Sequence, residues 1–122
     1  PLIEALDALD WREAAYAAWA LSLDERFALV VPSLLRAMQH QEWRVRADAA
    51  AGLVRSADPR AIPTMRAALA DNAWQVRMEA VSYFGLLGDA ESLESIKPSR
   101  TYPHIAVRTA AEAALKTQDW SR

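Results

Sequence analysis

The sequence predicts an all-α fold, a right-handed α-solenoid (superhelix) of about four helix-pair repeats with a period of 31 residues. The first observation behind this prediction is the dipeptide Val-Arg, which returns at one constant interval, starting at Val45, Val76 and Val107. The second is the composition, because 52% of the residues are apolar, many of them alanine, and glycine occurs only three times. Alanine favours helices and glycine opposes them, so this composition indicates a helical protein.

Seven sequence positions stay in step at this interval without a gap. They hold the Val-Arg pair, an alanine one turn later and, around them, mostly proline, tryptophan or large apolar residues. The aligned sets are Pro32, Pro63 and Glu94; Leu34, Met65 and Ile96; Trp43, Trp74 and Ile105; Val45, Val76 and Val107; Arg46, Arg77 and Arg108; Ala49, Ala80 and Ala111; and Leu53, Phe84 and Leu115.

The chain of 122 residues is expected to form one domain, long enough to bury a core without staples. Within 1–122, residues 1–21 are predicted to be a degenerate N-terminal cap repeat, since terminal repeats face water on one side. The predicted repeats are 22–56, 57–88 and 89–117, and 118–122 is a tail.

In the cap repeat, Ile3 to Leu6 is expected to be the tail of a first helix. Trp11 to Leu21 is expected to be a second helix in which Val-Arg is missing and the phase slips. Ser22 and Glu25 form a capping-box pattern that predicts the start of the next helix. Pro32 then falls near the middle of that helix and should kink it.

The following repeat gives the clearest signals. Asp58 and Pro59 predict a helix start, and Pro63 sits one turn later, where a lost backbone hydrogen bond costs least. In the second helix an apolar stripe leads to Gly88, which predicts a left-handed C-cap; the stripe is Val76, Ala80, Phe84 and Leu87.

The last repeat has an abbreviated first helix, Ala90 to Lys97, and a segment 97–104 whose two prolines oppose a regular helix. The final helix is predicted at about His104 to Thr117.

The stretch DPRAIPTMRAALADNAWQVRMEAVSYFGLLGD, Asp58 to Asp89, resembles the HEAT-like repeats of phycobilisome (bilin) lyase subunits along nearly its whole length. The resemblance covers roughly Leu23 to Lys116 and rests on a first-helix proline, a turn acid, Val-Arg and a run of alanines. It implies that the turn acid Asp71 and the repeated arginines form a structural ladder between stacked repeats. Because His40 and Tyr102 replace the acid in the other repeats, we expect an incomplete ladder.

The repeated arginines Arg46, Arg77 and Arg108 allow two interpretations. In the favoured one they are structural and bind turn carbonyls or a turn acid. In the other they form a strip that binds phosphates, which nearby acids and a net charge of −2 oppose. We therefore expect no nucleic-acid partner.

Other classes of site find no support in the sequence. Cysteine is absent, and neither histidine, His40 nor His104, has a second ligand at metal-binding spacing. No catalytic motif and no cofactor site is found, and without a His-Glu pair the di-iron HEAT-repeat hydroxylases are not matched. The longest uncharged run, Ala14 to Leu23, is too short for a membrane span of about 20 residues, and we expect a cytoplasmic protein.

The candidate partner-binding residues are those expected on the concave face of the second helices. Trp43 and Trp74 either cap the apolar seam between repeats or anchor a partner, because aromatic residues dominate binding hot spots. The candidate set is Trp43, Arg44, Ala47, Trp74, Gln75, Met78 and Ser82.

Two further regions allow more than one interpretation. Trp11, Tyr16 and Trp19 either plug the open end of the solenoid, or form an oligomer contact or the seam to a missing upstream repeat, and the oligomeric state stays open. The segment 97–104 either replaces a helical turn or presents functional side chains.

The predicted function is a non-catalytic scaffold or adaptor that binds a protein or peptide on its concave face. The alternative, which rests on the family resemblance, is a subunit of a bilin lyase-like enzyme or chaperone that handles a tetrapyrrole. DNA handling is a third class, and it would need a basic concave face that this chain lacks.

Overall fold

The computed structural model describes residues 10–24 and 26–120, with the side chains of residues 27 and 117–120 left aside. All regular structure in this part of the chain is helical, with seven α-helices and two 3₁₀-helices, which confirms the all-α prediction. The predicted Ile3 to Leu6 helix tail lies outside the described residues. The chain divides into two compact units, Pro1–Thr64 and Met65–Arg122, and helix α5 (Ile62–Ala68) crosses the boundary.

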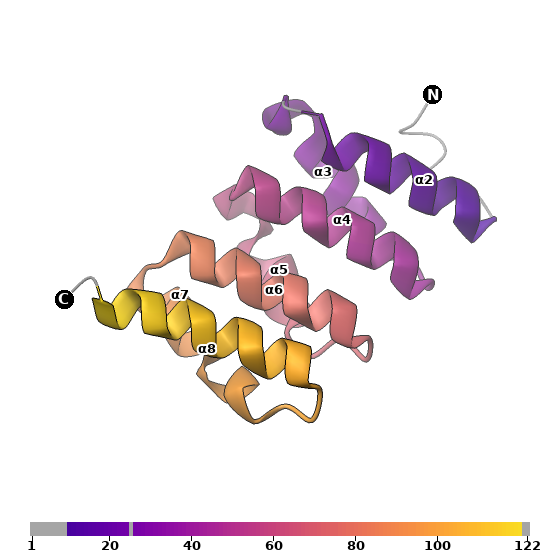
Figure 1. Cartoon of the computed structure of the whole chain (residues 1–122). Coiled ribbons are helices and arrows are strands. Elements are labelled where there is room, and N and C mark those ends of the chain that lie inside the picture. Colours follow the sequence, from indigo (N-terminus) through magenta and orange to yellow (C-terminus); the bar gives the residue numbers. More distant parts are fainter. Residues whose placement is uncertain (1–9, 25, 121–122) are drawn as a thin grey trace. The chain divides into compact units, whose positions relative to one another are not determined.

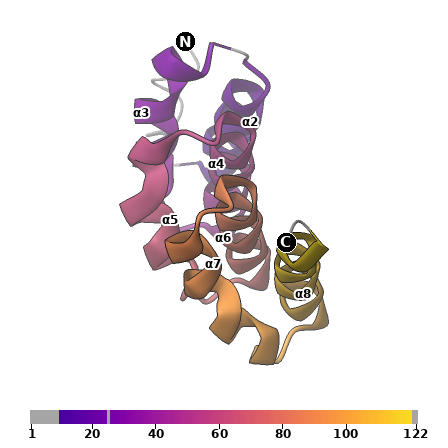
Figure 2. The same ribbon diagram turned by 90° about the vertical axis from the view of Figure 1, so that its left-hand side faces the viewer.

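Unit 1 contains α2 (Trp11–Ser22), α3 (Phe27–Ala37), α4 (Trp43–Ser56) and the 3₁₀-helix η1 (Pro59–Ala61). Helix α2 packs along α4, and α3 contacts both helices from one side (Figures 1 and 2). A Cβ added at Gly52 of α4 would lie 2.9 Å from the Cα of Ser22. Glycine at this position therefore lets the two helices approach closely.

Helix α2 keeps the phase of the repeats, contrary to the predicted slip. Its buried residues Ala14, Ala18 and Ser22 lie thirty-one residues before Val45, Ala49 and Leu53 of α4, which are buried as well. Small residues stand in α2 where the other repeats have valine and mostly leucine. They suit the close contact between α2 and α4, since alanines let helices approach.

The capping-box prediction at Ser22 was wrong. Ser22 ends α2, and its hydroxyl donates to the Trp19 carbonyl at 2.5 Å. Glu25 lies outside the described residues. Asp24 instead forms a turn just before α3, in which its carboxylate accepts the N–H of Arg26, the N-cap residue of that helix. Hydrogen bonds from Arg26 lower the pKa of Asp24 to about 2.

Pro32 lies inside α3, as predicted, and the backbone there finds an outside partner. A regular helix would bond the N–H of residue 32 to the Ala28 carbonyl, but proline has no N–H to donate. The Arg60 guanidinium, just after the start of η1, donates to this Ala28 carbonyl at 3.4 Å. The Ala28 carbonyl, which has no helical donor at Pro32, is thus partly satisfied by a hydrogen bond from a residue of η1.

Unit 2 contains α6 (Trp74–Leu87), α7 (Ala90–Ile96), the 3₁₀-helix η2 (Lys97–Thr101) and α8 (Ile105–Trp120). Helices α6 and α8 lie side by side, and α7 and η2 cover one side of the pair (Figures 1 and 2). The predicted stripe on α6 is buried at Val76, Ala80 and Phe84, while Leu87 is half-buried. Segment 97–104, predicted to resist a regular α-helix, contains the short 3₁₀-helix η2.

Both central helices end in the left-handed backbone conformation. Gly88 caps α6 with φ 68°, which confirms its predicted role. Ala57, thirty-one residues earlier, caps α4 with φ 49°. Alanine is strained there because its Cβ crowds the following carbonyl oxygen.

Candidate functional site

The repeated arginines bind the backbone of the turn that precedes their own helix. Arg46 Nη1 donates to the carbonyls of His40 and Gln41 at 2.9 and 2.8 Å. Arg108 Nη1 donates in the same way to Tyr102 and Pro103, at 2.8 and 2.7 Å. These bonds join the end of each turn to the first turns of the helix that follows.

Arg77, in unit 2, has a related arrangement. Its Nη1 donates to the Asp71 carbonyl at 2.5 Å, and its guanidinium carbon lies 5.1 Å from the centre of the Tyr102 ring. Its buried Nε has no hydrogen-bond partner among the described residues. The ring of Tyr102 offers this cation a partial substitute for water, since aromatic faces attract cations.

The Asp71 side chain and the residue that replaces it in unit 1 have the same role. Asp71 Oδ1 accepts the N–H of Ala73 at 2.9 Å. His40, thirty-one residues earlier, accepts the N–H of Glu42 through Nδ1 at 3.0 Å. An imidazole nitrogen without a proton thus acts as the turn acceptor that a carboxylate provides in the next repeat.

Tyr102, the third residue in this aligned set, makes a longer-range contact. Its hydroxyl donates to the Leu69 carbonyl at 2.5 Å, which ties the end of η2 to the turn before α6. Part of segment 97–104 therefore has a packing role within unit 2.

The candidate partner-binding residues fall into one set in each unit. On α4 of unit 1, Trp43 and Ala47 are half-buried and lie one turn apart, and Arg44 beside them is exposed. The Arg44 guanidinium lies between two indoles, 4.9 Å from Trp43 and 4.6 Å from Trp11. It is also bound to Glu42 at 2.6 Å. Trp11 thus contacts α4 and lies apart from Tyr16 and Trp19 on its helix.

On α6 of unit 2, Trp74, Met78 and Ser82 recur every fourth residue on one face, with Gln75 beside them, and all four are half-buried. One face of the Trp74 indole stacks on the His104 ring, with centroids 4.0 Å apart and planes 9° from parallel. His104 also accepts the N–H of Ala106 through Nδ1 at 3.1 Å, which fixes the ring at the start of α8.

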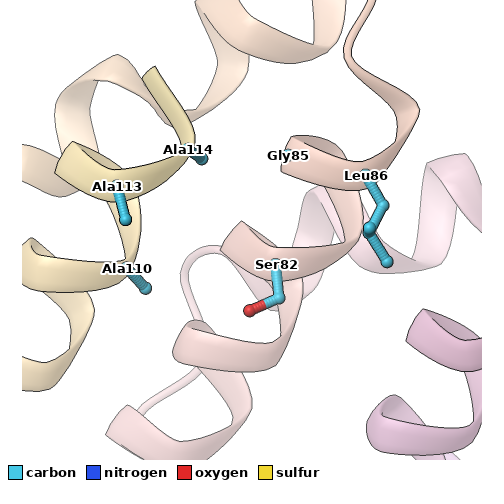
Figure 3. Close-up of a pocket in the computed structure, with 6 residues that line it drawn as sticks. All are labelled: Ser82, Gly85, Leu86, Ala110, Ala113 and Ala114. Carbon is cyan, nitrogen blue, oxygen red and sulfur yellow. The ribbon is translucent and has the colours of Figure 1, made fainter. Parts of the chain in front are cut away.

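A groove of about 460 Å³ lies between α6 and α8 on the same face. Figure 3 shows its lining, in which the only polar side chain is the Ser82 hydroxyl. Gly85 and Ala114 form its floor, because a Cβ at Gly85 would lie 2.9 Å from that of Ala114. The lining residues are Ser82, Gly85, Leu86, Ala110, Ala113 and Ala114.

Sequence reasoning named Ser82 as a candidate and gave no role to the other five lining residues. The signal was the set of small residues Ala110, Ala113 and Ala114 at one-turn spacing. Leu86, exposed at one edge of the groove, gave no periodic signal.

Two partly buried carboxyl groups occupy equivalent positions, Asp48 on α4 and Glu79 on α6. Burial raises the pKa of each.

In the described part of the chain, no group of three or more His, Cys, Asp and Glu side chains could hold a metal ion. None of the described helices is both long enough and apolar enough to cross a membrane.

The arrangement of helix pairs agrees with a family model of HEAT repeats, which matches residues 1–72 and 31–116. The chain belongs to the HEAT repeat family. Over 64 residues this HEAT chain is 38% identical to the deoxyhypusine hydroxylase of Saccharomyces cerevisiae and 41% identical to that of Candida glabrata. Each match covers 50% of the chain, and the matched region is 20% of the relative.

The sequence interpretation set the di-iron HEAT-repeat hydroxylases aside for want of a His-Glu pair, and no such pair stands anywhere in the sequence. Half of the chain is related in sequence to two proteins named as hydroxylases. The likeness covers about a fifth of the length of those proteins.

Proposed function

We propose that the protein is a non-catalytic HEAT repeat scaffold in the cytoplasm that binds a protein or peptide partner on the face of its second helices. The observation that carries this proposal is the apolar groove between α6 and α8, which lies beside the candidate residues Trp74, Met78 and Ser82. Helix-pair repeats keep their core on one side of these helices, so residues on the other side can vary without harming the fold.

The chemistry of this face suits an apolar side chain of a partner. Five of the six lining residues are Gly, Ala or Leu, so a guest there meets carbon rather than charge. Burial of one leucine-sized side chain is worth roughly 1.5–3 kcal/mol, enough to help anchor a peptide. The stacked Trp74–His104 pair provides a rigid aromatic neighbour on α6.

Within this proposal the repeated arginines Arg46, Arg77 and Arg108, together with Asp71, serve the structure. Hydrogen bonds from the guanidinium groups to turn carbonyls support this role. Guanidinium groups engaged in this way offer little to a phosphate backbone, and the net charge of −2 gives no long-range attraction to nucleic acid.

The test compares proteins captured from an extract of the source cell by three versions of the chain. The variant Ala110→Leu fills the groove, and Ile105→Ser removes an exposed apolar side chain of the same unit outside the groove. A partner bound through the groove is retained by the wild type and by Ile105→Ser and is lost with Ala110→Leu. Capture that Ala110→Leu leaves unchanged would contradict the proposal.

The second candidate is a subunit of an enzyme or chaperone that handles a tetrapyrrole. The resemblance of Asp58 to Asp89 to bilin lyase repeats favours it, and two relatives are enzymes by name. Incubation with a bilin, followed by absorption spectroscopy, separates the two functions. A shifted absorption band that is abolished by Ala110→Leu would favour the tetrapyrrole role, whereas an unchanged spectrum would favour the scaffold.

A further inference from the structure

The surface of unit 1 holds a cation between two indoles. The guanidinium carbon of Arg44 lies 4.6 Å from the centre of the Trp11 ring and 4.9 Å from that of Trp43. The Glu42 carboxylate binds the same guanidinium at 2.6 Å. Trp11, Trp43 and Glu42 thus form an indole cage around a cation, and cages of aromatic faces are a general means of recognising cationic ligands.

The repeat itself does not require the charged residues of this cage. The positions thirty-one residues after Glu42 and Arg44 hold Ala73 and Gln75, which carry no charge. Helix α6 begins directly after Ala73 and has the same length as α4. Since the second helix of a repeat forms without this acid and this arginine, their presence in unit 1 calls for another explanation.

The backbone around the cage is held in place by unit 1. Trp11 and Trp43 are the first residues of α2 and α4, and both are half-buried. The N–H of Glu42 donates to His40 Nδ1 at 3.0 Å, and Arg46 donates to the His40 carbonyl at 2.9 Å. A ligand that enters the cage therefore has little backbone to order, which favours binding.

The side chain that now fills the cage is the part that can move. The Arg44 side chain is 48% exposed, and in the described part of the chain its ion pair is with Glu42 alone. Asp48, one turn further along α4, is partly buried, and its carboxylate has no hydrogen bond or ion pair with any described residue. Burial raises the pKa of Asp48, so a cation beside it would stabilise its charged form. Side chains four residues apart on a helix are within reach of each other, so Arg44 can pair with Asp48 when it leaves the cage.

The charges around Trp11 are balanced, and this exchange keeps them so. A second guanidinium, that of Arg12, lies 5.2 Å from the centre of the Trp11 ring and is paired with Asp10 at 3.8 Å. A further cation would be unfavourable here if Arg44 stayed in place. When Arg44 moves to Asp48, the new cation takes over its carboxylate partner and no charge is left without one.

We propose that the indole cage binds an arginine side chain of a partner protein, and that Arg44 occupies the cage until that guanidinium replaces it. The arriving group takes over the two ring contacts and the bond to Glu42. A planar guanidinium suits this space because it stacks on aromatic faces and forks onto a carboxylate, which a lysine ammonium does not. Since Trp43 and Arg44 belong to the candidate partner-binding residues, the inference rests on the proposed function.

The test titrates three small probes into the full chain and follows the indole N–H signals by NMR. Acetyl-arginine amide is the expected ligand, acetyl-citrulline amide is planar but uncharged, and acetyl-lysine amide is charged but not planar. The signals of Trp11 and Trp43 should shift with the arginine probe and much less with the other two. The other indoles among the five tryptophans serve as internal references. Binding of the citrulline or lysine probe that equals binding of the arginine probe overturns the proposal.

Substitutions in and near the cage give a second readout. Arg44→Ala should bind the arginine probe about tenfold more tightly than the wild type, because a site filled by its own side chain about nine-tenths of the time loses that factor in apparent affinity. Glu42→Gln added to Arg44→Ala should weaken binding about fivefold or more through loss of a charge-assisted hydrogen bond. Arg55→Ala, which removes an exposed arginine elsewhere on α4, should bind as the wild type does. No saturable binding by Arg44→Ala up to about 50 mM, or tighter binding by the wild type, overturns the proposal.

Asp48→Asn tests the exchange itself. In the wild type it should weaken binding of the arginine probe, because the displaced Arg44 no longer finds a carboxylate. In Arg44→Ala the same substitution should have a smaller effect, since no side chain is displaced. Equal effects in the two backgrounds would mean that Asp48 acts on the ligand directly, and the exchange would be refuted.

These outcomes separate the inference from the proposed function. The groove between α6 and α8 is tested by Ala110→Leu, which lies in unit 2 and leaves the indole cage intact. Loss of captured partner with Ala110→Leu, together with no arginine binding by Arg44→Ala, would sustain the scaffold and refute the cage. Arginine binding that depends on Glu42, with capture unaffected by Ala110→Leu, would sustain the cage and refute the groove.

Discussion

The left-handed caps at Ala57 and Gly88 make a matched pair for measuring backbone strain. The two residues end equivalent helices, α4 and α6, and both have positive φ, 49° and 68°. One is alanine, which is strained in this conformation, and the other is glycine, which is not. Exchanging them one at a time, as Ala57→Gly and Gly88→Ala, should change stability in opposite directions.

The magnitude follows from two opposing effects. A residue with a Cβ in the left-handed region costs roughly 1–2 kcal/mol. Replacing alanine by glycine also raises the conformational entropy of the unfolded chain. This lowers the gain in folding free energy by about 0.4–1 kcal/mol. Ala57→Gly should therefore stabilise the protein by about 0.5–1 kcal/mol, and Gly88→Ala should destabilise it by a similar amount or slightly more.

The assay is urea unfolding at 25 °C, followed by circular dichroism in the far ultraviolet for the wild type, both single variants and the double variant. The midpoint should shift while the slope of the transition stays constant, since neither change alters the surface exposed on unfolding. The double variant should return close to the wild type because the two sites are in different units. A loss of stability in Ala57→Gly, or none in Gly88→Ala, would refute the reasoning.

Substitutions at four further positions test other contacts, each by urea unfolding. Gly52→Ala should destabilise by about 1–2 kcal/mol, because the new Cβ would meet the backbone of α2 at 2.9 Å; a gain would show that α2 and α4 separate easily. Tyr102→Phe should cost about 1 kcal/mol by leaving the Leu69 carbonyl without its donor, and no change would mean that water replaces the hydroxyl. His40→Ala should lose about 1 kcal/mol whereas His40→Asp should not, since a carboxylate can accept the same N–H; equal losses would contradict this. Burial raises the pKa of Glu79 above 4.5, so the wild type gains relative stability below that pH and loses it as pH rises through the folded-state pKa. Glu79→Gln should thus be more stable than the wild type at pH 7 and equal to it near pH 3, and the opposite order would refute the assigned cause.

Sequence alone was enough to predict the helix pairs of the centre. Val76, Ala80 and Phe84 recur every fourth residue, and a stripe of this width needs a helix with one buried face. Gly88 could be assigned as a cap because few other residues adopt its backbone angles at low cost. These features depend on neighbours within one or two helical turns, so pattern and propensity suffice.

The features that were missed depend on contacts between elements. Ser22 resembles a helix cap in sequence, but it is the last residue of α2 and lies against Gly52 of α4, a contact between helices that no local pattern reports. The stacking of Trp74 on His104 depends on how the turn before α8 is built, which no local pattern reports. The groove next to Ser82 is a property of two facing helices, and the small residues of α8 alone do not predict it.

The bond from each repeated arginine to its own turn has a consequence for how such a protein can grow. Arg77 fastens the turn at Asp71, and both lie within the segment 57–88. A gene duplication of that segment would copy the arginine and the turn that it binds together with both helices. The protein could lengthen by whole repeats, and the arginine of each new repeat would already bind the turn of that repeat. Selection would then need to change only the solvent-facing residues of the new repeat.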